Sequence, residues 1–317
     1  MVRSMQSENK YRPLTAKQAL QLAAPHTWAA SVCPSLFGIC YSRLMGFPLG
    51  PFRAAAVLAA CVFLQSAVNT LNDYVDFVKG TDSASDNVEV TDAVLVYGGI
   101  DPKSARNLGF FYLFAGLLSG LAASAGAGPV PLLIGAVGGA TVLLYSGGPL
   151  PVSSLPLGEV VSGFVMGGLI PLGTAACADG KLHPEILFYS LPLIIGIGLI
   201  MMSNNGCDIE KDLRAGRRTL PMILGRERTL KLYRFLTVFW ILLLLVLPVL
   251  LTGRRGFLCG VLLLLFARER FRNILALQLR PEQRVLQMKG IVAANIFGNG
   301  ALIVTLMAAV LMEALHA

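Results

Sequence analysis

Two segments of this sequence combine asparagine and aspartate residues in a pattern suited to binding a metal ion. They cover residues 69–82 and 203–221, and each places three oxygen-bearing side chains at the spacing i, i+3, i+7. The residues are Asn69, Asn72 and Asp76 in the first segment, and Asn205, Asp208 and Asp212 in the second. On a helix, this spacing puts the three side chains of each set on one face.

The acids and cations of these segments indicate a site for Mg²⁺ and a diphosphate. Carboxylates gathered in one place repel one another unless a positive charge lies between them. Mg²⁺ prefers hard oxygen ligands and typically binds a few carboxylates together with the phosphates of a substrate. The cations able to hold and neutralise a diphosphate are Lys79, Arg214, Arg217 and Arg218. A diphosphate held in this way is a good leaving group.

A second interpretation of each cluster is a set of solvated charges in a loop between membrane helices. For either cluster alone, the two interpretations are equally good. The matching spacing of the pair favours a functional site. Asparagines at the apolar approach to each cluster add to this preference, because polar groups inside a membrane bundle are costly and tend to be functional.

The composition shows which elements must position these residues. The chain has 317 residues, of which 55% are hydrophobic and 14% charged, and its mean hydropathy is +0.67. Several apolar stretches reach about 18 residues, enough to cross a bilayer as a helix. This excludes a water-soluble enzyme. The net charge of +8 comes mostly from residues between apolar stretches, and no basic tract is interleaved with aromatics, so we expect no nucleic-acid partner.

We predict an all-α polytopic membrane protein that forms a single domain over residues 1–317. No stretch alternates polar and apolar residues as a membrane barrel requires, and residues 1–18 form an expected cytoplasmic leader. About nine spans are predicted, at residues 19–45, 52–73, 107–126, 129–146, 157–178, 185–205, 229–252, 256–274 and 288–315.

Lysine and arginine residues concentrate in the connections after the even-numbered spans, which predicts that these connections are cytoplasmic. Both acidic segments then lie on the cytoplasmic face of the cell membrane. Four helices separate the two segments. This suggests two similar four-helix halves that face each other across a shared cavity, with a ninth helix added.

Several sequence segments together resemble the UbiA superfamily of intramembrane prenyltransferases, and within it most closely the MenA type. The segments are AAPHTWAASVCPSLFG at 23–38, NDYVDFVKGTD at 72–82, YSGGPLPVSSLPLGE at 145–159, NNGCDIEKDLRAGRRTLP at 204–221 and KGIVAANIFGNG at 289–300. The chain departs from the family where many members have arginine before the proline of the first helix, since Ala24 precedes Pro25. Residues 83–100 also differ from the usual loop.

The resemblance implies a helical bundle of nine spans around a central cavity that is open sideways to lipid. It implies that Asp76, Asp208 and Asp73 take part in catalysis, and it makes Tyr145 a candidate to contact the diphosphate or stabilise a cation. The implied Mg²⁺ ligands are Asn72, Asp76, Asp208 and Asp212, with Asp82 and Asn204 completing the candidate set. From the cations of the two segments, the diphosphate ligands we predict are Lys79, Arg214 and Arg217.

The activity implied is transfer of a polyprenyl group from an allylic prenyl diphosphate to an aromatic acceptor. For the MenA type the acceptor is 1,4-dihydroxy-2-naphthoate, and carbon dioxide is lost. Alternatives are 4-hydroxybenzoate, homogentisate or a lipid alcohol as acceptor. A membrane transporter is the main alternative of another class, and an inactive scaffold is a third.

Three residues near the predicted site have competing interpretations. Tyr145 is a candidate for the diphosphate or cation, and equally an aromatic anchor at the membrane interface. His26 is a candidate to orient an acceptor, or a hydrogen-bonded helix residue. Glu159 opens a predicted helix, where its carboxylate favours the helix dipole, so capping is its default explanation.

Overall fold

The computed structural model describes residues 11–80, 94–148 and 150–316, and these residues form helices and no strand. An isolated bridge pairs Arg12 with Ile100. The longer helices are α2 (Ala29–Leu44), α3 (Pro51–Val78), α5 (Pro102–Ser124), α6 (Pro129–Ser146), α8 (Ile170–Asp179), α10 (Leu191–Cys207), α13 (Arg226–Thr252), α15 (Arg268–Ala276) and α16 (Arg284–His316). The prediction of an all-α fold is confirmed for the described residues.

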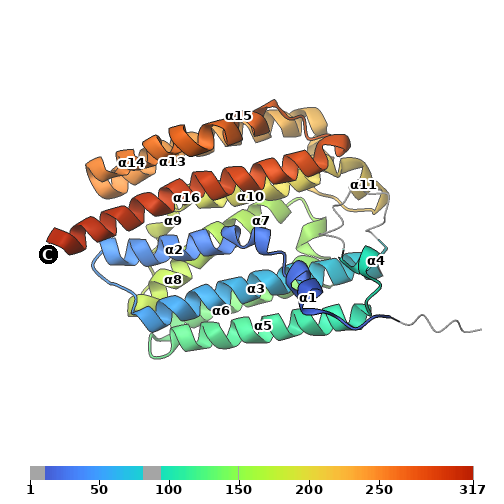
Figure 1. The fold of residues 1–317 in the computed structure, drawn as a ribbon, viewed down its shortest axis with the longest axis horizontal. Coiled ribbons are helices and arrows are strands. Elements are labelled where there is room, and N and C mark those ends of the chain that lie inside the picture. Colours follow the sequence, from blue (N-terminus) through green and yellow to red (C-terminus); the bar gives the residue numbers. More distant parts are fainter. Residues whose placement is uncertain (1–10, 81–93, 149, 317) are drawn as a thin grey trace, which may run out of the picture.

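Shorter helices connect or interrupt these. They are α1 (Ala16–Leu22), α4 (Val94–Gly98), α7 (Gly158–Phe164), α9 (Ile186–Tyr189), α11 (Ile209–Arg214), α12 (Leu220–Leu224) and α14 (Phe257–Leu262). Single wide turns, Val165–Leu169 and Leu263–Ala267, join α7 to α8 and α14 to α15. The long helices lie side by side with their axes roughly aligned, and α4 and α11 lie at the same end of the bundle (Figure 1).

The long helices are apolar enough to cross a membrane. Six stretches of the described residues are at least 18 residues long and sufficiently hydrophobic: Pro51–Val78, Pro102–Ser124, Pro129–Ser146, Gly158–Asp179, Arg226–Ala276 and Pro281–Leu315. The helix α10 is apolar but has only 17 residues. These stretches are those of an integral membrane protein. The count of nine spans remains a prediction.

The first predicted span is interrupted in the structure. Helix α1 ends at Leu22, and α2 begins at Ala29 after a short turn. Ala24 adopts a left-handed backbone with φ of 47°, and the following Pro25 disfavours the helical conformation at this position. The side-chain amide of Asn69 donates to the Ala23 carbonyl (3.1 Å) and to the Thr27 hydroxyl (2.9 Å). These two hydrogen bonds connect Asn69 on α3 to the turn between α1 and α2.

The first acidic segment is helical as far as Val78 in the part that the structure describes, as its spacing predicts. Helix α3 continues to Val78, beyond the predicted limit at residue 73, so Asn72 and Asp76 lie on successive turns of one helix. Helix α3 packs along α5, and α10 packs against α7, α13 and α16. The charged residues at the ends of α3 and α10 are therefore held by long packed helices.

An apolar pocket in the described part of the bundle lies away from the aspartates. Its volume is about 510 Å³, and α3, α5, α6 and α8 line it with residues such as Val57, Leu64, Gly120 and Ile134. Leu64 precedes Asp76 by twelve residues on α3, which corresponds to about 18 Å along the helix. The predicted central cavity at the aspartates is not confirmed by this pocket.

Candidate functional site

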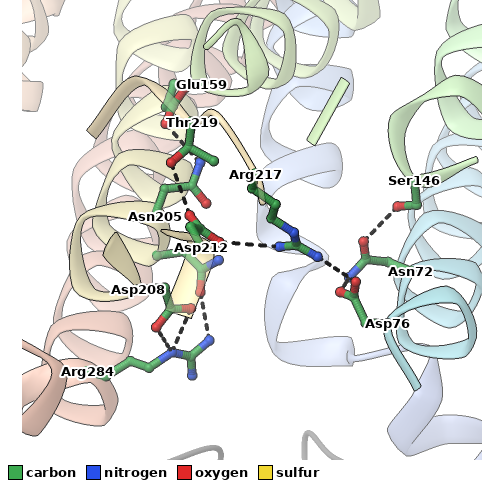
Figure 2. Close-up of polar contacts among 11 residues, drawn as sticks. Asn72, Asp76, Ser146, Glu159, Asn205, Asp208, Asp212, Arg217, Thr219 and Arg284 are labelled. Atoms are coloured by element: carbon green, nitrogen blue, oxygen red, sulfur yellow. Dashed lines mark hydrogen bonds and ion pairs between the residues drawn. The ribbon is translucent and has the colours of Figure 1, made fainter. Parts of the chain in front are cut away.

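Arg217 joins the two acidic segments directly. Its guanidinium donates through Nη2 to Asp76 Oδ1 at the end of α3 (2.5 Å), and its Nη1 lies 3.7 Å from Asp212 Oδ1 on α11. Figure 2 shows the arginine between the two carboxylates. Asp76 and Arg217 are 141 residues apart in the sequence, so the fold brings the two segments together.

A second arginine holds the other aspartate of the later segment. Asp208 lies at the junction of α10 and α11, and it accepts hydrogen bonds from Arg284 Nε at 2.8 and 3.2 Å. Arg284 Nη2 also donates to Asn204 Oδ1 (2.8 Å). Asp208 and Asn204 are thus linked through one cation, which comes from the first residue of α16.

These contacts form a charged layer in which carboxylates and guanidinium groups alternate. Asp212 is only 2% exposed, and it accepts a hydrogen bond from the Thr219 hydroxyl (3.0 Å). Burial raises the pKa of Asp212 to about 6, although Arg217 and Thr219 act in the opposite direction. A carboxylate in these surroundings binds a cation strongly once it is ionised, because little water competes.

A second polar layer lies one helical turn further into the bundle. Asn72 precedes Asp76 by one turn on α3; its amide donates to Asp76 Oδ2 (3.1 Å), and its carbonyl accepts from the Ser146 hydroxyl (2.6 Å). On the opposite side, Asn205 precedes Asp208 on α10 and donates to Glu159 Oε1 (2.8 Å). We call Asn72, Ser146, Tyr145, Asn205 and Glu159 the inner polar layer.

The oxygen atoms of this site suit Mg²⁺ that is bound partly by the protein and partly by a substrate. They do not form a complete coordination shell from protein side chains alone. Within the described part of the chain, no three His, Cys, Asp or Glu residues converge to hold an ion. The carboxylates of Asp76 and Asp212 instead lie on either side of Arg217, and Asp208 binds Arg284. The side-chain amides of Asn72 and Asn204 belong to the same contacts. Mg²⁺ commonly uses one or two carboxylates plus substrate phosphates, so these residues fit that kind of site.

The structure brings most of the predicted site residues together. Asn72, Asp76, Asn204, Asp208, Asp212 and Arg217 all belong to the contacts above. Asp73 is partly buried on α3, next to this group. Lys79, Arg214 and Arg218 are exposed at the same end of the molecule. Asp82 lies outside the described residues.

Two of the residues with competing interpretations differ in where they lie. The ring of Tyr145 is near the end of α6, next to Ser146, and its hydroxyl is buried. His26 is exposed in the turn between α1 and α2. Tyr145 therefore belongs to the inner polar layer, and His26 is on the surface.

Sequence reasoning missed Arg284, Ser146 and Thr219. Arg284 follows the basic stretch 268–280, where arginine residues indicate only the cytoplasmic side of the membrane. Ser146 and Thr219 are small hydroxyl residues whose partners lie on other segments. A signal was available for both of these, since Ser146 lies in the segment 145–159 and Thr219 in the segment 204–221 that carry the family resemblance.

Comparison with known proteins gives a consistent result. Residues 31–289 match the UbiA prenyltransferase family. Over 207 residues the chain is 34% identical to the 1,4-dihydroxy-2-naphthoate octaprenyltransferase of Bacillus subtilis, covering 65% of this chain and 66% of that protein. It is 30% identical over 216 residues to the UbiA prenyltransferase domain-containing protein 1 of Gallus gallus, covering 67% of this chain and 63% of that one. The chain thus spans slightly less than two thirds of these relatives' length.

A third curated relative is the 1,4-dihydroxy-2-naphthoate octaprenyltransferase of Mycobacterium tuberculosis, 30% identical over 67% of this chain and 71% of that protein. Among solved structures, a UbiA homolog from Archaeoglobus fulgidus aligns with a TM-score of 0.65 and 17% identity over 92% of this chain and 99% of that one. The same homolog bound to DMAPP and Mg²⁺ aligns with a TM-score of 0.60 and 17% identity over 90% and 99% of the two chains. At this identity, the structures support the fold.

Proposed function

Because this chain belongs to the UbiA prenyltransferase family, we propose that it transfers a polyprenyl group from an allylic prenyl diphosphate to 1,4-dihydroxy-2-naphthoate with loss of carbon dioxide. Two curated relatives carry the name of that activity. The family membership favours a transferase over a transporter or a scaffold. The other acceptors, 4-hydroxybenzoate, homogentisate and a lipid alcohol, are alternatives within the same class.

The contact of Arg217 with both acidic segments is the observation that carries the proposal. Arg217 contacts Asp76 and Asp212, and Arg284 binds Asp208 four residues before Asp212, at the end of an apolar bundle. A diphosphate with an apolar tail matches this arrangement, because its charged end and its tail need opposite surroundings. We assign the Mg²⁺ ligands to Asn72, Asp76, Asp82, Asn204, Asp208 and Asp212.

When bound, Mg²⁺ supplies Lewis acidity that weakens the bond between the allylic carbon and the diphosphate oxygen. Arg217 and Arg284 bind the phosphate oxygens and neutralise the charge that develops on them as the bond breaks. Lys79 and Arg214 extend this positive region towards the surface, and Asp73 supports Asp76.

The remaining residues act on the organic part of the reaction. The apolar helices exclude water, so the activated prenyl group is not hydrolysed to an alcohol. We assign to the aromatic ring of Tyr145 the stabilisation of the positive charge that develops on the reacting carbon. We place this face of the site on the cytoplasmic side of the cell membrane, because lysine and arginine residues concentrate in the connections there.

A mass-spectrometric assay of the purified protein in detergent tests the proposal. The reaction contains Mg²⁺, a prenyl diphosphate and one acceptor from a panel that includes 1,4-dihydroxy-2-naphthoate, 4-hydroxybenzoate and homogentisate. We expect a product that is heavier by the prenyl group and lighter by carbon dioxide, with dihydroxynaphthoate only. Transfer to another ring would replace the proposed acceptor. Absence of both transfer and diphosphate release with every acceptor would refute the activity.

A further inference from the structure

The inner polar layer contains two buried oxygen atoms that have no hydrogen-bond partner among the described residues. They are the hydroxyl oxygen of Tyr145 and Oε2 of Glu159. Glu159 is only 3% exposed. Leaving a buried polar atom unpaired costs free energy, and the cost is larger for a carboxylate than for a neutral group. Two such atoms in one layer need an explanation beyond packing.

These atoms lie close to the place where the proposed reaction occurs. Tyr145 is within electrostatic reach of Glu159, Arg217 and Asp76. Glu159 is bound through its other oxygen to Asn205, which lies one turn before Asp208 on α10. A substrate with its diphosphate in the charged layer and its tail in the bundle must place its first carbon at the depth of the inner polar layer.

The position of Glu159 is fixed by close packing of its helix. A side chain at Gly163 would meet the Ile194 carbonyl oxygen at 2.5 Å, and one at Gly167 would meet the Ile194 nitrogen at 2.4 Å. These two glycines let the helix that begins with α7 lie directly against the backbone of α10. Glu159, one turn before Gly163, is therefore held against α10 by backbone packing and by the Asn205 bond.

The helix dipole does not account for this arrangement. An acid in the first turn of a helix is stabilised by the dipole, and Glu159 does occupy the first turn of α7. That effect operates equally at an exposed position, where water satisfies both carboxylate oxygens. It explains neither the burial of Glu159 nor the unpaired Oε2. The expected capping role is thus insufficient.

We propose that Glu159 Oε2 is the recognition point for the aromatic acceptor and accepts a hydrogen bond from a ring hydroxyl, with the Tyr145 hydroxyl binding the same molecule. This deepens the proposed function and rests on it. A hydroxylated ring supplies a donor for the carboxylate, and a flat ring occupies the layer beside the first carbon of the prenyl chain. A hydrogen bond to a carboxylate also raises the electron density of the ring, which favours attack on that carbon.

The test is a kinetic comparison of Glu159→Gln with the wild type, in detergent, with acceptor and prenyl diphosphate varied separately. The glutamine keeps an oxygen that accepts from Asn205 and replaces Oε2 with a group that cannot accept. We expect kcat/KM for the acceptor to fall by about 10- to 100-fold, the size of one hydrogen bond to a charged group. We expect KM for the prenyl diphosphate to change by less than about twofold, because Glu159 is proposed to bind the acceptor and not the diphosphate. Tyr145→Phe should lower kcat/KM for the acceptor by a smaller factor.

Ser162→Ala is the matched control. Ser162 lies on α7 three residues after Glu159 and is also buried; its hydroxyl donates a hydrogen bond to the Glu159 carbonyl oxygen (3.1 Å). The Ser162→Ala variant should leave the KM values for both substrates unchanged. The melting temperature of each variant reports on its folding.

The outcomes separate this inference from the proposed function. A wild-type protein that transfers to no aromatic ring would overturn both. A Glu159→Gln variant with unchanged kcat/KM for the acceptor, or with an equal loss towards both substrates, would overturn this inference and leave the proposed function standing.

Discussion

Two buried polar clusters of this protein differ in how completely their atoms are paired. The first joins α10, α13 and α16 in the interior of the bundle: Asn299 accepts from Trp240 Nε1 (3.2 Å) and donates to Asn295, which donates to the Gly196 carbonyl (2.9 Å). The second is the inner polar layer beside the aspartates. In the first cluster the side-chain amide and indole groups pair with one another. In the second, the Tyr145 hydroxyl and Glu159 Oε2 find no partner in the part of the chain that the structure describes.

The difference indicates two uses of polar residues in a membrane bundle. Hydrogen bonds between helices hold them together in an apolar environment, each contributing about 0.6 kcal/mol on average. A cluster with all its partners inside the protein has little left to offer a ligand. A cluster with unpaired atoms next to charged residues is prepared to bind one. Substitutions in the first cluster should therefore lower stability, and substitutions at the site should lower activity.

The largest effect is expected for the aspartates of the charged layer. Asp76→Ala and Asp208→Ala should each lower the rate of prenyl transfer by about 1,000-fold or more, because each removes a proposed Mg²⁺ ligand. Rates are measured with saturating substrates, and melting temperatures should stay within a few degrees of the wild type. Glu227→Ala, an exposed acid on α13, is the control and should be fully active. Full activity of either aspartate variant would contradict the assignment.

A smaller loss is expected at Arg217. Arg217→Gln should raise KM for the prenyl diphosphate and lower kcat, together about 100-fold in kcat/KM. The variant loses a cation that contacts two carboxylates and that we propose to bind the diphosphate. Arg217→Lys should recover only part of the loss, since a lysine lacks the planar fork of donors. Equal activity of the two variants would show that the forked geometry has no role.

A substitution in the cluster of Trp240, Asn295 and Asn299 should lower stability and leave activity unchanged. Asn299→Leu removes the partners of Trp240 and Asn295, which we expect to destabilise the protein by about 1–2 kcal/mol. This corresponds to a drop of about 2–8 °C in melting temperature. Transfer activity below the melting transition should stay close to that of the wild type. A selective loss of activity without a lower melting temperature would break the distinction between the two clusters.

The smallest effects are expected for the exposed cations. Lys79→Ala and Arg214→Ala should raise KM for the prenyl diphosphate by no more than about threefold, because solvent and salt screen charges at exposed positions. The effect should shrink further at high ionic strength, which is tested by repeating the KM measurements across a salt series. An effect as large as that of Arg217→Gln would place these side chains at the diphosphate itself.

Much of the site followed from the sequence because its residues repeat a helical spacing on two segments. The i, i+3, i+7 pattern requires that both segments be helical or end helices, and α3 and α10 meet that condition for Asn72, Asp76, Asn205 and Asp208. The approximate positions of the long helices also followed, because hydrophobic length is a local property of the chain.

Other features depend on contacts between distant segments and leave no local pattern. Arg284 is one of several arginines in its region, and only the packing of α16 beside α10 selects it as the partner of Asp208. Glu159 resembles an ordinary acid in the first turn of a helix until its burial against α10 is known. The interruption at Ala24 was also missed, since a proline after an alanine allows either a kinked or a broken helix.

The most direct test of the central claim is Mg²⁺-dependent binding of a prenyl diphosphate, measured by calorimetry on the detergent-solubilised protein. The wild type, Asp76→Ala, Asp208→Ala and Asn299→Leu are compared with and without Mg²⁺. We predict that binding requires Mg²⁺, is lost in both aspartate variants and persists in Asn299→Leu. Binding that is independent of Mg²⁺, or that survives in both aspartate variants, would contradict a site formed by the two acidic segments.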